Sequence, residues 1–232
     1  MAQGCLKCLK YTMCVANLLC FICGAVVLGF GVYMTLNFKF AALTPTLASF
    51  NLANMLLISG IVITCVSFLG FLGALKENRC LLLTYFLLLF VLMLVELTAA
   101  CLLLVYEKEI GELVKKDLVN GLKVANNPNT TDTNVERDWD VVQQKLQCCG
   151  VNNETDWKPK PPPPSCCAAD CDLPKPKYWK KGCLITLQNF FEDNFLTTGI
   201  SVIVLCIIEV LGMCFAMTLF CHISRSGLGY KL

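Results

Sequence analysis

Four long apolar stretches constrain this chain more than any other feature of its sequence. Each is 24 or 27 residues long, and together they account for 102 of the 232 residues. A helix of about 20 apolar residues spans the hydrocarbon core of a bilayer. We therefore expect four transmembrane helices, at residues 13–36, 52–75, 80–106 and 195–221. A soluble fold built from the whole chain is excluded, and a net charge of +2 gives no indication of nucleic-acid binding.

Basic residues in the short connections predict the orientation of the chain. The N-terminal segment 1–12, the turn 76–79 and the tail 222–232 together carry six basic residues in 27, whereas the short loop 37–51 carries only Lys39. Lys and Arg in short loops are retained on the cytoplasmic side of the membrane. We therefore predict that both termini are cytoplasmic and that the loops 37–51 and 107–194 are extracellular.

The 88-residue loop 107–194 has the composition of a small oxidised domain. It contains six of the 17 cysteines, at positions 148, 149, 166, 167, 171 and 183. An even number of cysteines in a small extracellular domain indicates disulfides. The loop also contains two N-glycosylation sequons, at Asn129 and Asn153, which agree with an outer location.

Helical periodicity and proline runs divide this loop into segments. Apolar residues between Ile110 and Leu122 recur every three or four positions, so we expect the third span to continue as a helix until residues 126–128. A second amphipathic helix has positions 135, 139, 142 and 146 on one face, with Gly150 as a left-handed cap. Residues 158–164 predict an extended polyproline segment, and a final helix begins after Gly182.

Adjacent cysteines restrict how the disulfides are arranged without selecting one pairing. Cys148 and Cys149 cannot readily pair with each other, so we expect them to join one helix end to two other segments. A zinc site is the rival interpretation of the cysteine cluster. It is disfavoured because the only histidine, His222, is predicted on the other side of the membrane. Disulfides are expected to supply much of the stability of so small a domain.

Three cysteine motifs in the loop carry a resemblance to a known family. Cys148-Cys149-Gly150, followed by Pro163-Pro-Ser-Cys166 and Gly182-Cys183, resembles the ectodomain signature of the tetraspanins. The resemblance covers nearly the whole chain and extends to residues 9–11, 17, 70–78, 96 and 209–213. It implies an all-α membrane protein with four transmembrane helices and a small disulfide-stabilised helical extracellular domain, of the short six-cysteine type.

The resemblance also implies a disulfide pairing. The implied pairs are Cys148–Cys183, Cys149–Cys166 and Cys167–Cys171. The first two are general in the family, and the third belongs to six-cysteine members. The proline run before Cys166 departs from the usual pattern and is expected to stiffen residues 151–181, which we call the variable segment.

Three polar residues in the apolar spans require an explanation. A carboxylate in lipid costs ~2.5–3.5 kcal/mol, so Glu96 and Glu209 are expected to face the interior of the helix bundle. For Glu96 we favour a hydrogen bond to a neighbouring helix. For Asn17 and Glu209 the family resemblance implies an intramembrane cavity that takes up a sterol such as cholesterol, with plain packing as the alternative.

Small residues recur every seven positions in the first two spans. The two series are Asn17, Gly24, Gly31 and Ala53, Gly60, Ser67, Ala74. Small side chains let helix backbones approach closely in lipid. We therefore predict that the first two helices pack against each other.

Cysteines at the predicted cytoplasmic edge are candidates for lipid attachment. They are Cys5, Cys8, Cys80 and Cys221. A juxtamembrane thiol facing the cytosol can be S-palmitoylated, and the resemblance supports this assignment. The alternative is that each cysteine packs as a small apolar residue.

The sequence contains no catalytic constellation, so we predict a protein that is not an enzyme. One enzymatic alternative is a four-span thiol oxidoreductase that uses Cys20 and Cys23, which have Cys-x-x-Cys spacing. The favoured function is a membrane organiser that binds partner receptors and other tetraspanins laterally and assembles them into microdomains. Such a protein would influence adhesion, signalling and trafficking.

The variable segment supplies the partner-binding candidates. Aromatic side chains dominate interface energetics, and a basic run suits an acidic partner. The candidates are Trp157, Tyr178, Trp179, Lys175, Lys177, Lys180 and Lys181. The resemblance implies integrins, immunoglobulin-type receptors, other tetraspanins and membrane lipid as partners. It places the chain in the plasma membrane and in endosomal or vesicle membranes, with no cofactor apart from bound cholesterol.

Overall fold

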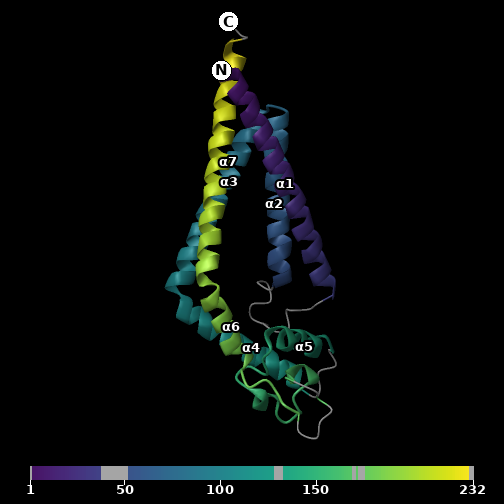
Figure 1. The fold of residues 1–232 in the computed structure, drawn as a ribbon. Coiled ribbons are helices and arrows are strands. Elements are labelled where there is room, and N and C mark those ends of the chain that lie inside the picture. The colour runs from purple at the N-terminus through teal and green to yellow at the C-terminus, as the bar shows by residue number, and fades with distance from the viewer. Residues whose placement is uncertain (1, 38–51, 128–132, 169–170, 172–175, 230–232) are drawn as a thin grey trace. The chain divides into compact units, whose positions relative to one another are not determined.

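Helices form almost all of the regular structure in the described parts of the chain (Figure 1). The computed structural model describes residues 2–37, 52–127, 133–168, 171 and 176–229. Two compact units result: a membrane unit (Met1–Val32, Leu56–Val105, Thr198–Leu232) and a loop unit (Tyr33–Met55, Tyr106–Thr197). The elements, in chain order, are α1 (Ala2–Asn37), α2 (Leu52–Leu75), α3 (Arg79–Val105), α4 (Glu107–Asn126), α5 (Thr133–Leu146), η3 (Glu154–Trp157), η4 (Pro164–Cys166), α6 (Cys183–Asp193) and α7 (Phe195–Gly229).

The four predicted transmembrane helices are confirmed. Helices α1, α2, α3 and α7 contain stretches long and apolar enough to cross a membrane, at Leu6–Leu36, Ala53–Leu75, Arg79–Val105 and Phe195–Arg225. Helix α1 begins at Ala2, before the predicted start at residue 13, and α7 continues to Gly229, past the predicted end at residue 221. Neither extension contains a proline that would stop the helix, so both helices continue beyond their apolar stretches.

A short turn joins α2 to α3 and is tied to α1. Glu77 adopts a left-handed backbone conformation, with φ of 51°. Asn78 caps α3, because its Oδ1 accepts hydrogen bonds from the backbone N–H groups of Cys80 (2.9 Å) and Leu81 (3.4 Å). Lys10 Nζ lies 2.7 Å from Glu77 Oε1, so an ion pair connects this turn to the first part of α1.

Helices α1 and α2 pack along their small residues, as the seven-residue repeat predicts. All seven residues of the two series are buried. A methyl group added at Gly60 would lie 2.6 Å from Leu28 N, and one added at Gly31 would lie 2.9 Å from Leu57 N. The two backbones therefore approach too closely for a larger side chain at these positions.

All four membrane helices meet around Tyr85 of α3, which is 6% exposed. A Cβ at Gly70 of α2 would lie 2.7 Å from the Tyr85 ring and 2.5 Å from Asn17 Oδ1 of α1. A Cβ at Gly212 of α7 would lie 3.1 Å from the Tyr85 hydroxyl. The core of the membrane unit thus lies toward the ends of α1 and α7 that carry the chain termini. Its other buried residues are Met13, Cys14, Val66, Ala74, Leu82, Leu89, Met213, Ala216 and Leu219.

Helices α4, α5 and α6 build the loop unit around its cysteines. The amphipathic helices predicted in this loop are confirmed, and α4 begins at Glu107 after a break of one residue, Tyr106. The apolar face of α5 carries Trp139, Val142 and Leu146 and packs into the core. The buried core residues are Leu118, Leu122, Ala125, Trp139, Cys148, Cys149, Val151, Trp157, Cys166 and Cys183.

Two predictions for the loop unit are wrong in detail. Gly150 has the predicted left-handed conformation, with φ of 63°, but the left-handed residue that directly follows α5 is Gln147, with φ of 52°. The proline run is not continuous polyproline, because residues 158–159 form a turn and Pro164 begins η4. The fixed φ of proline suits the first position of a helix as well as a polyproline segment.

Candidate functional site

Three disulfides lie in the loop unit, and they join the same pairs that the family resemblance implies. Cys148–Cys183 ties the end of α5 to the start of α6, Cys149–Cys166 ties it to η4, and Cys167–Cys171 closes a short loop. The cysteines of the first two bonds are at most 2% exposed, so these bonds belong to the core. The end of α5 is therefore fixed to two separate segments.

Two glycines allow the segments around these disulfides to approach each other. Gly150 has a positive φ, and a Cβ at Gly182 would overlap the backbone oxygen of Val151. Hydrogen bonds join the same segments: the Cys183 N–H donates to Gly150 O and the Leu184 N–H donates to Val151 O, both at 3.0 Å. Gly150 of the Cys-Cys-Gly motif is thus required by its backbone conformation. Gly182 of the Gly-Cys motif is required by the close approach of a neighbouring backbone.

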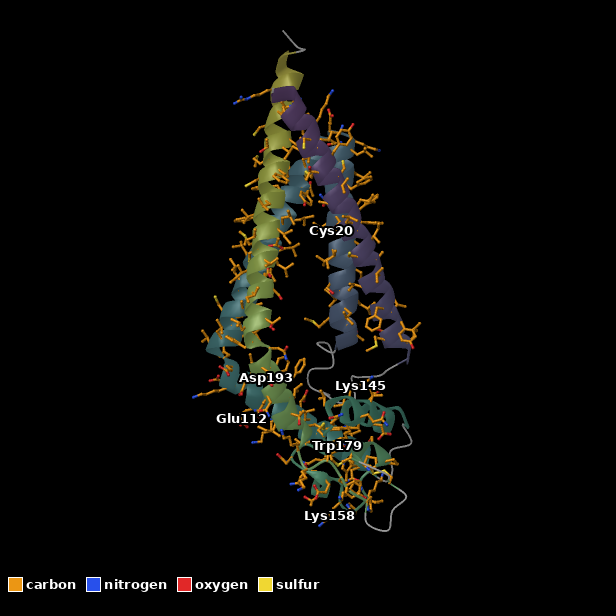
Figure 2. All side chains as sticks on the ribbon, in the orientation of Figure 1. Cys20, Glu112, Lys145, Lys158, Trp179 and Asp193 are labelled. Atoms are coloured by element: carbon orange, nitrogen blue, oxygen red, sulfur yellow. A yellow bond between two sulfur atoms is a disulfide. The ribbon has the colours of Figure 1, made fainter. Side chains whose placement is uncertain are left out.

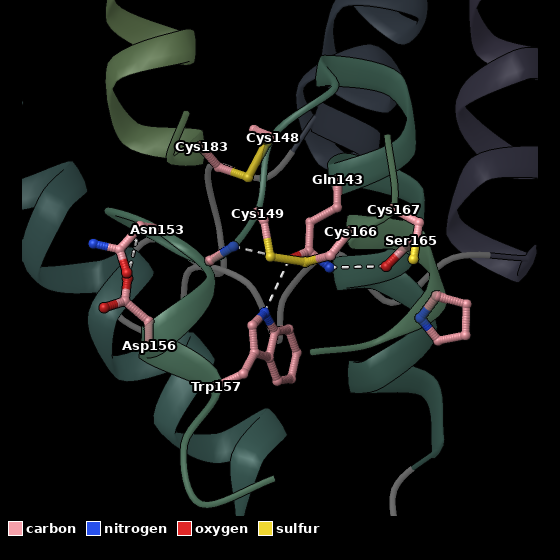
Figure 3. Close-up of a disulfide and its surroundings, with 12 residues drawn as sticks. Gln143, Cys148, Cys149, Asn153, Asp156, Trp157, Ser165, Cys166, Cys167 and Cys183 are labelled. Atoms are coloured by element: carbon pink, nitrogen blue, oxygen red, sulfur yellow. Dashed lines mark hydrogen bonds between the residues drawn. A yellow bond between two sulfur atoms is a disulfide. The ribbon is translucent and has the colours of Figure 1, made fainter. Parts of the chain in front are cut away.

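A buried glutamine, which the sequence analysis missed, lies at the centre of this arrangement (Figure 3). Gln143 of α5 is fully buried, and its Oε1 accepts hydrogen bonds from the Gly150 N–H and the Trp157 indole N–H, both at 3.0 Å. Its Nε2 donates to Ser165 Oγ at 2.9 Å, and Ser165 Oγ donates to Asp140. The signal available in the sequence was a polar residue four positions after Trp139, next to the apolar face of α5.

Trp157 is a core residue and not a surface anchor, which corrects the sequence prediction. Its side chain is 3% exposed, and its ring meets Trp139 edge to face, with the ring centroids 6.2 Å apart. The indole N–H is used internally, by Gln143. The ring surface and the indole N–H of Trp157 are both occupied inside the loop unit. Trp157 therefore stabilises this unit and is not available to a partner.

The other partner-binding candidates lie closer to the surface. Tyr178 and Trp179 are half-buried and pack one side against the core, and the Trp179 N–H donates to Cys166 O at 2.8 Å. Lys177, Lys180 and Lys181 are exposed, whereas Lys175 lies outside the described residues. The structure thus offers two partly exposed aromatic side chains close in sequence to three exposed lysines.

One of the two predicted glycosylation sites can be placed. Asn153 is half-buried and caps η3, because its Oδ1 accepts a hydrogen bond from the Thr155 N–H at 2.9 Å. Asp156 completes a capping box by accepting a hydrogen bond from the Asn153 N–H at 3.3 Å. Asn129 lies outside the described residues. Glycan attachment at both positions stays a prediction.

The three polar residues of the spans differ in their surroundings. Asn17 lies beside Gly70 and Tyr85 in the four-helix contact, and its Nδ2 donates to Met13 O at 2.9 Å. Glu96 of α3 contacts α7, since Cys206 Sγ lies 3.6 Å from Glu96 Oε2. Glu209 of α7 is partly buried. Uptake of a sterol at Asn17 and Glu209 stays a prediction.

The free cysteines differ in their accessibility. Cys8, Cys80 and Cys221 are exposed, as acylation requires, whereas Cys14 is buried. The side chain of Cys5 lies outside the described residues, although its backbone belongs to α1. Cys20 and Cys23, the pair of the oxidoreductase alternative, are separate exposed thiols. Figure 2 shows Cys20 on α1. Within the described residues, no group of three His, Cys, Asp or Glu side chains is placed to hold a metal ion.

Comparison with known proteins agrees with this architecture. A model of the Tetraspanin family matches residues 9–222. The chain belongs to the tetraspanin family. Leukocyte surface antigen CD53 of Bos taurus is 42% identical over 226 residues, which cover 97% of each chain. CD53 of Homo sapiens is 41% identical over the same length and coverage. Tetraspanin-4 of Mus musculus is 36% identical over 236 residues, covering 97% of this chain and 98% of its own.

Membership of the tetraspanin family identifies the two units of the structure. This tetraspanin is an all-α, multi-pass membrane protein with four membrane helices. The loop unit is its small helical extracellular domain, stabilised by disulfides. The Cys-Cys-Gly motif of the family corresponds here to the point where α5 is joined to α6 and η4.

Proposed function

We propose that this protein is a short six-cysteine tetraspanin that acts as a non-enzymatic membrane organiser. It binds partner receptors and other tetraspanins laterally and assembles them into microdomains, with consequences for adhesion, signalling and trafficking. The observation that carries this proposal is the disulfide-bonded domain, whose α5 end is tied to two segments while the variable segment keeps half-exposed aromatic and exposed basic side chains. Such a surface suits recognition of a protein partner.

The proposed orientation has both termini in the cytoplasm and the protein at the plasma membrane and in endosomal or vesicle membranes. The charge bias of the short connections supports the orientation. The name of the related CD53, leukocyte surface antigen, supports the plasma-membrane location. N-glycans at Asn129 and Asn153 and palmitates at the cytoplasmic edge belong to the same proposal. Acylation is supported by the exposure of Cys8, Cys80 and Cys221.

The proposed partner classes are integrins, immunoglobulin-type receptors and other tetraspanins, contacted through the variable segment. Tyr178 and Trp179 are the aromatic candidates, and Lys175, Lys177, Lys180 and Lys181 are the basic ones. Bound cholesterol near Asn17 and Glu209 is a further element of the proposal. It is supported by the polar character of these residues within apolar spans.

Exchange of the variable segment tests the proposal. Residues 151–181 are replaced by the corresponding segment of human CD53, and partners are recovered from cells by cross-linking in mild detergent. We expect the recovered set of membrane proteins to change. As a control, the tail 222–232 is exchanged in the same way, with no change expected. An identical set of partners after the segment exchange would instead place recognition in the membrane helices.

A further inference from the structure

The buried amide of Gln143 connects parts of the loop unit that are far apart in sequence. Its three hydrogen bonds reach the backbone of Gly150, the indole of Trp157 in η3 and the hydroxyl of Ser165 in η4 (Figure 3). The sequence separations are 7, 14 and 22 residues. One side chain on α5 therefore contacts three places in residues 150–166: Gly150, η3 and η4.

The disulfides do not perform the same task. Cys149–Cys166 restrains η4 at one residue, and no disulfide includes a residue of η3. Helix η3 is held to α5 by the Trp157–Gln143 hydrogen bond and by the contact between Trp157 and Trp139. A buried amide that lost these partners would be left unsatisfied, at a cost that favours one arrangement of the chain over its alternatives.

We propose that Gln143 is a positioning residue for partner recognition. It holds η3 and η4 in one arrangement relative to α5, and residues 151–168 present their exposed side chains to a protein partner only in that arrangement. Gln143 is fully buried and never touches the partner itself. The inference rests on the proposed function, because residues 151–168 belong to the variable segment. Backbone hydrogen bonds from the Trp179 N–H to Cys166 O and from the Ala168 N–H to Lys177 O join them to the stretch that carries the aromatic and basic candidates.

The test uses the full-length protein in lipid nanodiscs and the substitution Gln143→Met, which keeps the length of the side chain and removes its hydrogen bonds. Gln144→Met is the matched control, because Gln144 is the next residue of α5 and is exposed. The probes are nanobodies raised against the native protein. One set has epitopes within residues 151–168, and the other binds the exposed lysines of α4.

Gln143→Met is expected to weaken binding of the first nanobody set by about 10- to 100-fold, the range for lost buried hydrogen bonds. Binding of the α4 set and the disulfide map are expected to be unchanged. Leu118→Ala separates presentation from stability, since it removes core packing of α4 but none of the hydrogen bonds of Gln143. It should lower the melting temperature without altering affinity of the first set. Wild-type affinity of Gln143→Met for that set would overturn the proposal.

Ser165→Ala provides a second route if Gln143→Met loses binding of both nanobody sets, which would indicate unfolding. This substitution removes the acceptor of the Gln143 Nε2 bond and the donor of the bond to Asp140, and it leaves both bonds of Gln143 Oε1 in place. We expect several-fold weaker binding of the first set alone. Unchanged binding would overturn the inference. If the nanobodies respond as expected while the segment exchange leaves the cellular partners unchanged, Gln143 positions this surface but the proposed function of the surface fails.

Discussion

Gly182→Ala is the substitution whose effect follows most directly from the structure. Gly182 precedes α6 and is buried, and an added Cβ would overlap the backbone oxygens of Val151 and Asn152. Its φ of −73° and ψ of 157° are open to any residue. The predicted cost therefore comes from close approach alone and not from backbone conformation.

The magnitude follows from the hydrogen bonds that hold the two segments together. Relief of the overlap requires a shift of about 0.5–1 Å, which would stretch the Cys183–Gly150 and Leu184–Val151 backbone bonds from their length of 3.0 Å. Overpacking costs about 1–3 kcal/mol, and each weakened hydrogen bond costs about 0.5–1.5 kcal/mol. The two hydrogen bonds together cost about 1–3 kcal/mol, which equals the cost of overpacking. Since relaxation exchanges one cost for the other, we expect a loss of about 1–3 kcal/mol in the free energy of unfolding of the extracellular domain.

Tryptophan fluorescence measures this loss selectively. All three tryptophans of the chain, Trp139, Trp157 and Trp179, lie in the extracellular domain, so a thermal melt of the detergent-solubilised protein reports on that domain. We expect a fall in melting temperature of about 4 °C or more. Gly111→Ala is the control: it lies in α4 with nothing within 4 Å of the added Cβ, and it should stabilise by about 0.5–1 kcal/mol. A Gly182→Ala melt within about 2 °C of wild type would refute the close-approach argument.

Three further predictions address the other parts of the molecule. Trp157→Ala should lower the free energy of unfolding by about 3–5 kcal/mol in the same fluorescence melt. Trp179→Ala should lower it less and should reduce the recovery of partner proteins. A stable Trp157→Ala protein that recovers fewer partners would show that Trp157 is a surface anchor after all. Gly60→Ala should lower the free energy of unfolding of the membrane helices by about 1–3 kcal/mol, because the added Cβ would overlap the Leu28 backbone. Gly29→Ala is the control and should have no such effect, because nothing lies within 4 Å of its added Cβ. Equal effects of the two substitutions would contradict the packing of α1 on α2. Replacement of Cys5, Cys8, Cys80 and Cys221 by serine should abolish metabolic palmitate labelling and Cys14→Ser should leave it unchanged, since Cys14 is buried; persistent label in the fourfold variant would refute the assignment.

The membrane helices were predictable because their cause is local. A stretch of apolar residues long enough to span a bilayer must satisfy its own backbone hydrogen bonds, whatever the rest of the chain does. The same holds for α4 and α5, whose apolar faces repeat at helical spacing. The ends were less predictable, since α1 and α7 continue beyond their apolar stretches until the described helix stops at Ala2 and Gly229.

The disulfide pairs were accessible from the family resemblance and not from cysteine spacing. Spacing indicated only that Cys148 and Cys149 must join two different segments. The structure adds the reason for the glycines around them, because Gly150 requires a positive φ and Gly182 lies against a neighbouring backbone. Close approach between residues 151 and 182 is a property of the folded chain and leaves no pattern in either segment alone.

The sequence by itself determined which stretches are apolar enough to cross the membrane, which loop carries the cystine-rich domain and which α-helices that domain contains. Only the tertiary structure decided that Trp157 is buried, that Gln143 links α5 to η3 and η4, and that four helices meet at Tyr85. The physical reason is that apolar length and helical period are properties of consecutive residues. Burial and hydrogen-bond partnership depend on side chains that become neighbours only when distant segments pack together.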